Sequence, residues 1–264
     1  MADILTRILE RKREEVAHLK KYGFEKANLS QGGSPTLFNA LHSSKVLGVI
    51  AEIKRASPSR GDIVSAIEPE QQAKLYERGG AAAISVLTDT DFFKGSIEDL
   101  KTVRKETYLP LLCKDFFIDE IQIDRAKDAG ANIILLIVAA LPQDRLDELY
   151  QYASSRGLEV LVEIHDEEEA DRAAALGACM IGINNRNLKT FEIDLANTER
   201  LASLVNDKDR VIISESGMRS REDALRAARA GADGILVGES LMRSGEAEKT
   251  IGSFAVSKEG ALLG

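Results

Sequence analysis

The chain has 264 residues, of which 44% are hydrophobic but only 5% aromatic, so its core must be built from aliphatic side chains. The formal net charge of -8 argues against nucleic acid as the main partner, although a local pocket can still bind a phosphorylated small molecule. No apolar run has the length of a membrane helix, and the acidic N-terminus has neither a signal-peptide core nor the composition of a transit peptide. We therefore expect a cytoplasmic protein that does not bind membranes.

The cysteines and histidines indicate neither a disulfide framework nor a metal site. Cys113 and Cys179 lie far apart in sequence, each within an apolar run. The three histidines, His18, His42 and His165, are too few and too scattered to suggest a zinc site. We interpret both cysteines as small buried hydrophobic residues in a reducing compartment.

Residues 1–45 precede the first expected strand and are interpreted as a helical extension. Apolar residues recur there at roughly helical spacing, namely Ile4, Leu5, Ile8, Leu9, Val16 and Leu19. This pattern predicts an amphipathic helix that covers part of the main fold. The charged run at 11–15 leaves open the alternative of a solvated arm.

The rest of the chain alternates short β-rich runs with helical segments. Strands are expected at 46–53, 82–87, 109–114, 132–138, 158–164, 179–183, 210–214 and 233–237. Helices are expected at 69–78, 97–106, 120–129, 142–156, 167–176, 195–205 and 221–230. Several helical segments end at a glycine, such as Gly80 or Gly130, which favours the left-handed conformation that often terminates a helix.

This alternation predicts parallel strands joined by right-handed helical crossovers. Eight such units match the size of a closed (β/α)8 TIM barrel, so we expect residues 1–264 to form one α/β barrel domain. An open doubly wound sheet is the alternative. It is disfavoured because no glycine-rich dinucleotide loop follows the first strand.

Polar residues stand at the carboxyl ends of several expected strands, where TIM barrels place their active sites. The first strand ends in Glu52 and Lys54, which share one face because side chains alternate along a strand. Lys114, Glu163 and Asn184 end three further strands. Any one of the five could belong to a structural ion pair at the rim. Their convergence on one rim favours a catalytic site, because burying such groups is costly unless they pair with each other or with a ligand.

The loops after the last two strands have the composition of a phosphate site. Ser216–Gly217 follows the seventh strand and Gly238–Glu239–Ser240 the eighth. Barrels often bind phosphate there through backbone N–H groups and a short helix. We expect the N–H groups of Gly217, Gly238 and Glu239 to contribute, with the hydroxyl of Ser57. An ordinary strand-to-helix turn is the alternative for the Gly-Glu-Ser segment alone.

Two phenylalanine pairs, Phe92–Phe93 and Phe116–Phe117, follow the second and third strands although the chain has only 8 phenylalanines. They could simply cap the core beneath the loops. A functional interpretation is an apolar slot for a flat ring beside the lysines.

Several of these segments resemble the indole-3-glycerol-phosphate synthase family. The similarity extends from about residue 3 to 245 and is carried by the following segments: EIKRASPS (52–59), SVLT (85–88), FKGS (93–96), KDF (114–116), VEIH (162–165), IGINNRNL (181–188), SESG (214–217) and VGESLM (237–242). The IGINNRNL segment and the Lys-x-x-Ser-Pro-Ser part of the first are specific, whereas the Gly-Glu-Ser end is common to other phosphate-binding barrels. The resemblance is to the monofunctional form.

The resemblance implies a lyase of tryptophan biosynthesis that needs no cofactor and no metal. The implied substrate is 1-(2-carboxyphenylamino)-1-deoxyribulose 5-phosphate, which undergoes ring closure, decarboxylation and dehydration. Lys114 would protonate the ketone, Lys54 would hold the carboxylate, and Glu163, oriented with Asn184, would act as base. Glu52 would tune the two lysines. Such proton transfers favour groups whose pKa values burial and neighbours move toward neutrality.

The resemblance also implies a set of substrate-binding residues. Phe93, Phe116 and Leu188 would enclose the benzoate ring, and Arg186 and Glu215 would be partners at the rim. The full set of expected binding residues is Ser57, Phe93, Phe116, Arg186, Leu188, Glu215 and Ser216, with the phosphate loops described above.

Three other functions are compatible with parts of this pattern. A sugar-phosphate isomerase is disfavoured by the residues at the ends of strands one and five. A Schiff-base aldolase remains open because two lysines are available, as does a non-catalytic barrel that binds a phosphorylated metabolite. We expect a monomer.

Overall fold

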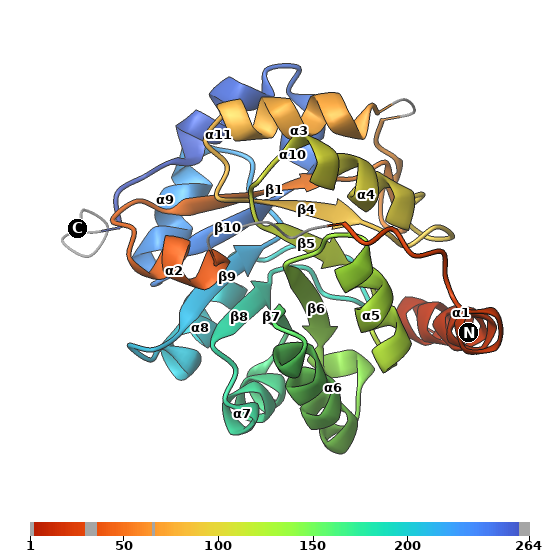
Figure 1. Ribbon diagram of the computed structural model, residues 1–264. Coiled ribbons are helices and arrows are strands. Elements are labelled where there is room, and N and C mark those ends of the chain that lie inside the picture. The colour runs from red at the N-terminus through yellow and green to blue at the C-terminus, as the bar shows by residue number, and fades with distance from the viewer. Residues whose placement is uncertain (1–2, 30–35, 65–66, 259–264) are drawn as a thin grey trace.

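The computed structural model describes residues 3–29, 36–64 and 67–258, and its centre is a closed barrel of eight parallel strands (Figure 1). Around the barrel the order is β1–β10–β9–β8–β7–β6–β5–β4, and β4 pairs again with β1. The barrel strands are β1 (Gly48–Ile53), β4 (Ala83–Leu87), β5 (Leu111–Lys114), β6 (Ile133–Ile137), β7 (Glu159–Ile164), β8 (Met180–Asn184), β9 (Val211–Glu215) and β10 (Gly234–Val237). The expected TIM barrel is confirmed, and the open sheet is wrong.

Helices follow the strands and surround the barrel, close to the positions that the sequence predicts (Figure 1). They are α3 (Pro69–Arg78), α4 (Ile97–Glu106), α5 (Glu120–Asp128), α6 (Gln143–Ser155), α7 (Glu167–Leu176), α8 (Ala196–Val205), α9 (Arg221–Arg229), α10 (Glu239–Arg243) and α11 (Ala247–Phe254). A 3-10 turn, η1 (Val138–Ala140), follows β6.

Side-chain alternation along each strand divides the apolar core into two layers. On β1, Ala51 and Ile53 point outward and pack in the larger cluster between strands and helices. Ile50 points inward and packs with the cluster that fills the barrel. Glu52 also points inward and reaches the pocket at the carboxyl end of the strand. The alternation that the sequence predicted for Glu52 and Ile53 is therefore confirmed.

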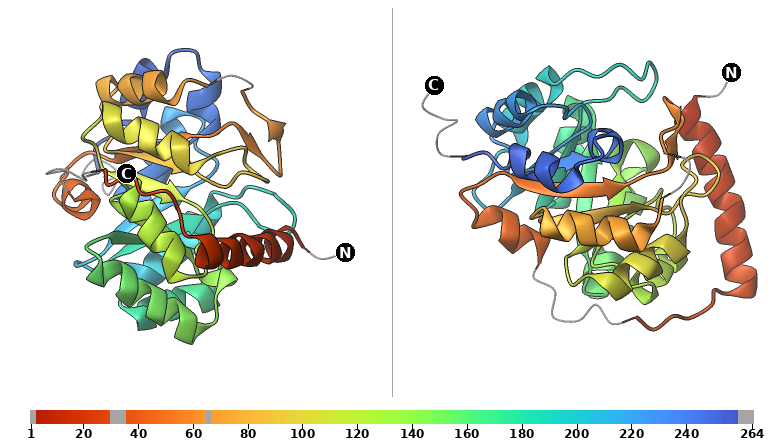
Figure 2. Two further views of the ribbon diagram at one scale, coloured as in Figure 1. Left: turned by 45° about the vertical axis from the view of Figure 1, so that its right-hand side comes forward. Right: turned by 90° about the horizontal axis from the view of Figure 1, so that it is seen from above.

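Helix α1 (Ile4–Tyr22) lies along the side of the barrel, and its first turns reach the carboxyl ends of the strands (Figure 2). Asp3 begins the helix by accepting a hydrogen bond from the backbone N–H of Thr6. Ile8, Val16 and Leu19 bury one face of the helix. The amphipathic helix is confirmed, and the alternative of a solvated arm is wrong.

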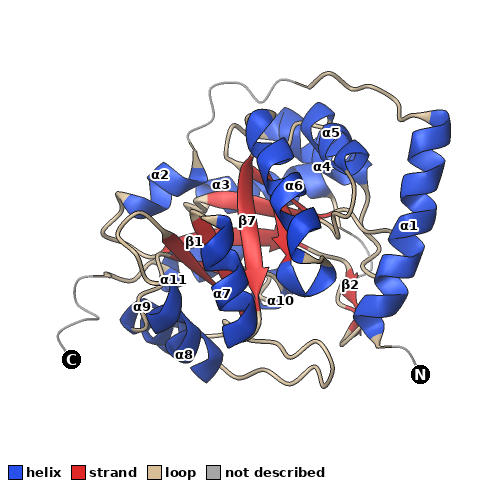
Figure 3. Ribbon diagram, turned by 90° about the horizontal axis from the view of Figure 1, so that it is seen from below, coloured by secondary structure: helices blue, strands red, loops and turns tan. Residues whose placement is uncertain are grey.

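A second helix, α2 (Leu37–His42), covers the amino-terminal end of the barrel (Figure 3). Leu37 and Leu41 are fully buried in the cluster that fills the barrel. The Glu159 carboxylate accepts hydrogen bonds from the backbone N–H groups of Leu37 and Phe38, both at 2.8 Å. The sequence analysis did not predict this helix, because its six residues are too short for a periodic pattern.

Two further features depart from or extend the expectations. Residues after β1 form a small hairpin of β2 (Ala56–Ser57) and β3 (Gly61–Asp62), at the same end of the barrel as the first turns of α1 (Figure 2). Cys113 is buried as expected, whereas the expectation for Cys179 is wrong: it is exposed, because it lies outside the barrel strand, one residue before β8 begins at Met180. Among the described residues, no helix is both long and apolar enough to cross a membrane.

Candidate active site

A cavity of about 340 Å³ opens at the carboxyl ends of the barrel strands. Its volume is in the range of small-molecule binding sites. Every residue that the sequence analysis proposed for the site lines this cavity: Glu52, Lys54, Ser57, Phe93, Lys114, Phe116, Glu163, Asn184, Arg186, Leu188, Glu215, Ser216, Gly217, Gly238 and Glu239. The barrel therefore brings together side chains from distant parts of the chain, and their individual roles remain proposals.

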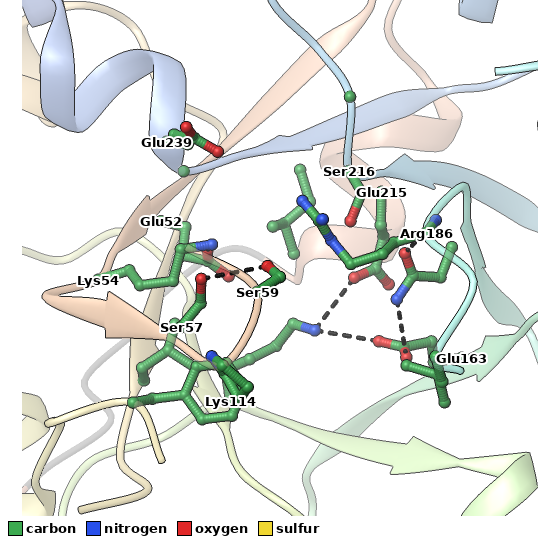
Figure 4. Close-up of a pocket in the computed structure, with 18 of the residues that line it drawn as sticks. Glu52, Lys54, Ser57, Ser59, Lys114, Glu163, Arg186, Glu215, Ser216 and Glu239 are labelled. Atoms are coloured by element: carbon green, nitrogen blue, oxygen red, sulfur yellow. Dashed lines mark hydrogen bonds and ion pairs between the residues drawn. The ribbon is translucent and has the colours of Figure 1, made fainter. Parts of the chain in front are cut away.

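Lys114, at the end of β5, lies at the centre of the charged cluster (Figure 4). Its ammonium is 3.0 Å from Oε2 of Glu163 and 3.1 Å from Oε2 of Glu215. Burial alone would lower the pKa of Lys114, but the carboxylates of Glu163, Glu215 and Glu52 outweigh it and raise the pKa above its usual value. The expectation of a pKa nearer neutrality is wrong for this lysine, which stays protonated in the free protein.

Glu163 is surrounded by three groups that favour its ionised form. Besides Lys114, Nδ2 of Asn184 donates a hydrogen bond to Oε1 of Glu163 at 3.1 Å. Nε2 of His165 lies 3.2 Å from the same oxygen. Burial opposes ionisation, but these neighbours hold the pKa of Glu163 well below its usual range. Glu163 is therefore an ionised carboxylate with three close partners in the free protein.

His165 was missed as a member of this cluster, although it lies two residues after Glu163 on the same side of the chain. Its Nδ1 is 3.0 Å from Oε2 of Glu169 in the first turn of α7. Burial would lower the pKa of His165, but the two glutamates raise it to about 10. The imidazolium thus lies behind Glu163. The two-residue spacing was a usable signal, but the partner Glu169 could not be recognised from sequence.

Glu215 is the deepest carboxylate of the cluster, and it was wrongly expected to pair with Arg186 at the rim. It ion-pairs with Lys114 instead, whereas NH1 of Arg186 donates to the backbone oxygen of Phe191 at 3.1 Å. Burial raises the pKa of Glu215 to about 7, and the negative charge of Glu163 adds to the effect. A Cβ atom on Gly182 would lie 2.1 Å from Oε1 of Glu215, so glycine is needed there to make room for the carboxylate.

Glu52 and Lys54 form a separate ion pair on the opposite wall of the cavity (Figure 4). Nζ of Lys54 is 2.6 Å from Oε1 of Glu52. A Cβ atom on Gly238 would lie 2.4 Å from that oxygen and 3.2 Å from the ammonium. The glycine after β10 therefore allows this pair to lie directly against the loop expected to bind phosphate.

The two loops expected to bind phosphate have unusual backbone conformations. Ser216 and Gly217 both adopt positive φ, at 66° and 90°. Helix α10 begins directly after Gly238, and its first two residues, Glu239 and Ser240, line the cavity. The Glu239 carboxylate pairs with Arg60 at 3.5 Å and with Arg243 at 3.4 Å. This geometry is compatible with the expected use of the Glu239 backbone rather than its carboxylate.

An aromatic wall lies beside Lys114. The rings of Phe93 and Phe116 have centroids 6.0 Å apart and are tilted by 36°. Phe117 instead packs in the outer core, so the two phenylalanines after β5 take different environments. Leu188, from the loop after β8, lines the same cavity.

Comparisons with known proteins agree with this geometry. The family model described as "Indole-3-glycerol phosphate synthase" matches residues 5–254. The chain belongs to this family. Indole-3-glycerol phosphate synthase of Bacillus cereus is 54% identical over 244 residues, which is 92% of this chain and 94% of the relative. The enzyme of Oceanobacillus iheyensis is 51% identical over 254 residues, covering 96% of each chain.

A solved structure outside the indole-3-glycerol phosphate synthase family shares only the fold. Thiamine phosphate pyrophosphorylase from Pyrococcus furiosus superposes with a TM-score of 0.61 at 18% identity, covering 86% of this chain and 100% of that one. At this identity the similarity concerns the barrel and not the chemistry.

Within this site the sequence analysis also missed the contribution of α1. Ile4, Leu5 and Ile8 line the cavity, although the helix was expected only to cover the barrel. Their apolar periodicity was visible, but which face of the barrel the helix approaches depends on tertiary packing.

Proposed function

We propose that this chain carries out the reaction of its family, the conversion of 1-(2-carboxyphenylamino)-1-deoxyribulose 5-phosphate to indole-3-glycerol phosphate, CO2 and water. The main support is the ammonium of Lys114, which lies between the carboxylates of Glu163 and Glu215. This cation lies in a cavity that also has an aromatic wall and two loops suited to phosphate. One cavity thus offers a proton donor, a base and sites for both ends of the substrate.

Ring closure needs a proton on the ketone oxygen as the aromatic carbon that carries the carboxylate attacks the ketone carbon. Lys114 supplies it, because its neighbours keep it protonated until a substrate arrives. Phe93 and Phe116 hold the ring at the angle needed for attack. The carboxylate then leaves as CO2, and its bonding electrons restore the aromatic ring. Lys54 reaches into the cavity from the end of β1 and provides the cation that binds the substrate carboxylate before it is lost.

Dehydration then removes the new hydroxyl group as water and a proton from the adjacent carbon. Glu163 is positioned to accept that proton, because it is ionised, as a base must be, and Asn184 fixes one of its oxygens. A protonated group must donate to the leaving hydroxyl, and Glu215, with a pKa near 7, joins the two lysines as a candidate. Glu52 holds Lys54 in place through their 2.6 Å contact.

The phosphate is proposed to bind at the loops after β9 and β10. Gly217, Gly238 and Glu239 line that end of the cavity, and their backbone N–H groups would donate to the phosphate. Hydroxyl groups from Ser57 and Ser216 add hydrogen bonds, as does the guanidinium of Arg186. Leu188 closes the aromatic side.

Replacing Lys114 by alanine tests the proposal directly. The product is an indole, and the chain contains no tryptophan, so product fluorescence can be followed without an indole background from the protein. We expect Lys114→Ala to lose at least about 1,000-fold in turnover, since it removes the proton donor and a buried charge. Binding of the product, measured by the same fluorescence, should persist. Turnover near that of the wild type would show that Lys114 is not the acid.

Lys101 offers a matched control for this experiment. Its side chain is 13% exposed, against 14% for Lys114, and it also forms an ion pair, with Glu98 at 2.7 Å. It lies on α4, outside the cavity. We expect Lys101→Ala to retain wild-type turnover, so that any loss in Lys114→Ala reflects chemistry rather than the removal of a half-buried lysine.

A further inference from the structure

Lys12, on the third turn of α1, is a buried lysine that the proposed reaction does not use. Its side chain is 1% exposed. Its ammonium lies 2.8 Å from Oδ2 of Asp89, 2.9 Å from Oδ1 of Asp115 and 3.0 Å from Oε2 of Glu15. Burial alone would lower the pKa of Lys12, but these three carboxylates raise it above its usual value. An ammonium so deeply buried costs stability unless its partners compensate.

Asp89 holds the loop that carries Phe93. It lies two residues after the end of β4, and its Oδ1 accepts hydrogen bonds from the backbone N–H groups of Phe92 at 2.7 Å and Phe93 at 3.2 Å. The other oxygen of the carboxylate contacts Lys12. The orientation of the turn at Phe93 therefore depends on where the ammonium holds this carboxylate.

Asp115 holds the loop that carries Phe116. It follows Lys114, and its Oδ1 accepts a hydrogen bond from the backbone N–H of Phe116 at 2.8 Å. Its Oδ2 accepts one from the hydroxyl of Thr88 at 2.7 Å. Thus a single ammonium, on a helix outside the barrel, joins the two loops whose phenylalanine rings form the aromatic wall.

We propose that Lys12 is a positioning residue for the aromatic wall, which through Asp89 and Asp115 sets the distance and tilt between Phe93 and Phe116. This inference rests on the proposed function for the identity of the ring that the wall receives. Lys12 takes no part in proton transfer. It determines how tightly the aromatic end of the substrate is held, and leaves the phosphate end to the loops after β9 and β10.

The test uses one probe for each end of the cavity. 2-Aminobenzoate represents the aromatic end of the substrate, and inorganic phosphate represents the other end. The inhibition constants of both are measured with kcat and KM for Lys12→Met, which keeps an unbranched apolar side chain one atom shorter and removes the charge. We expect the 2-aminobenzoate constant and KM to rise about tenfold, because small displacements of positioning groups have effects of this size. The phosphate constant should stay within about twofold of wild type, whereas kcat should fall, because Phe93 and Phe116 also orient the ring for attack.

Lys20→Met is the matched control. Lys20 lies on the same helix and pairs with Asp119, which also follows β5, but its side chain is 57% exposed. The Lys20→Met variant should leave the inhibition constants of 2-aminobenzoate and of phosphate unchanged. A Lys12→Met protein that is folded and binds 2-aminobenzoate normally would overturn the proposal. Equal weakening of both probes would also overturn it, because that result indicates a general loss of structure.

Thr88→Val provides a milder variant in case Lys12→Met does not fold. It removes only the hydroxyl that donates to Asp115, and we expect a smaller loss with the same selectivity for 2-aminobenzoate. Equal weakening of 2-aminobenzoate and phosphate in Thr88→Val, or no weakening of 2-aminobenzoate, would contradict the proposal. Failure of the proposed function is recognised separately: wild-type protein would show no turnover of the substrate, whatever the selectivity of the variants for the two probes.

Discussion

Two glutamates at opposite ends of β7, Glu159 and Glu163, show how one strand serves two different purposes. Both point into the barrel, with Leu161 between them. Glu159, at the amino-terminal end, accepts hydrogen bonds from two backbone N–H groups of α2. Burial raises the pKa of Glu159, whereas the cations around Glu163 overcome burial and lower the pKa of that residue.

The difference follows from what closes each end of the barrel. At the amino-terminal end, α2 places Leu41 among the inward-facing apolar residues and leaves the strand ends covered. At the carboxyl end, charged side chains line an open cavity and are paired with one another. Carboxylates are tolerated at both ends because each has partners, but only the second arrangement leaves groups free to act on a ligand.

The largest expected effect comes from replacing these two glutamates in parallel. Glu163→Gln removes the proposed base, and we expect turnover to fall by about 10²–10⁴-fold. Glu159→Gln lies outside the cavity, so turnover should be unchanged. The free energy of unfolding should change by less than about 1 kcal/mol, because the loss of one accepting oxygen and the removal of a buried charge oppose each other. Steady-state kinetics and denaturant unfolding of both variants check this. A similar loss of turnover in both would mean that the two ends are not functionally separate.

A smaller effect is expected from Gly182→Ala, which alters the charged end without removing a charge. The added Cβ would meet Oε1 of Glu215 at 2.1 Å and push the carboxylate from its position beside Lys114. We expect turnover to fall by about 10–100-fold, because the geometry around Lys114 changes. Gly252→Ala is the control, since nothing lies within 4 Å of its added Cβ. Unchanged turnover in Gly182→Ala would show that the position of Glu215 is not critical.

The smallest effect concerns the pH dependence of stability. The pKa of Glu215 is about 7 in the folded protein and near 4.5 when unfolded, so the unfolded chain loses this proton first. Glu215 therefore lowers stability progressively between these pH values and fully above pH 7. Glu215→Gln lacks this titration. We expect its Tm relative to wild type to rise between pH 5 and pH 8, on the order of a few degrees, as measured by calorimetry. A difference independent of pH would contradict the raised pKa.

The site residues could be predicted wherever a polar residue ends the apolar run of a single strand. Glu52, Lys114 and Glu163 could be located because each ends an apolar run, and the fold class then places all strand ends on one rim. The short α2 was not predicted, nor was the exposure of Cys179, because neither has a periodic pattern. The sequence also did not show that Glu215 pairs with Lys114 and not with Arg186. That pairing depends on how deeply Glu215 is buried in the barrel, which tertiary structure decides.

The sequence by itself determined the alternation of strands and helices, the closed barrel and the rim on which the polar residues meet. These follow from local rules, since periodicity and chain order fix which face and which end a side chain occupies. Only the tertiary structure decided the ionisation of the cluster and the role of α1. A pKa depends on burial and on charges from other strands, and Lys12 finds Asp89 and Asp115 only when the helix has packed beside them.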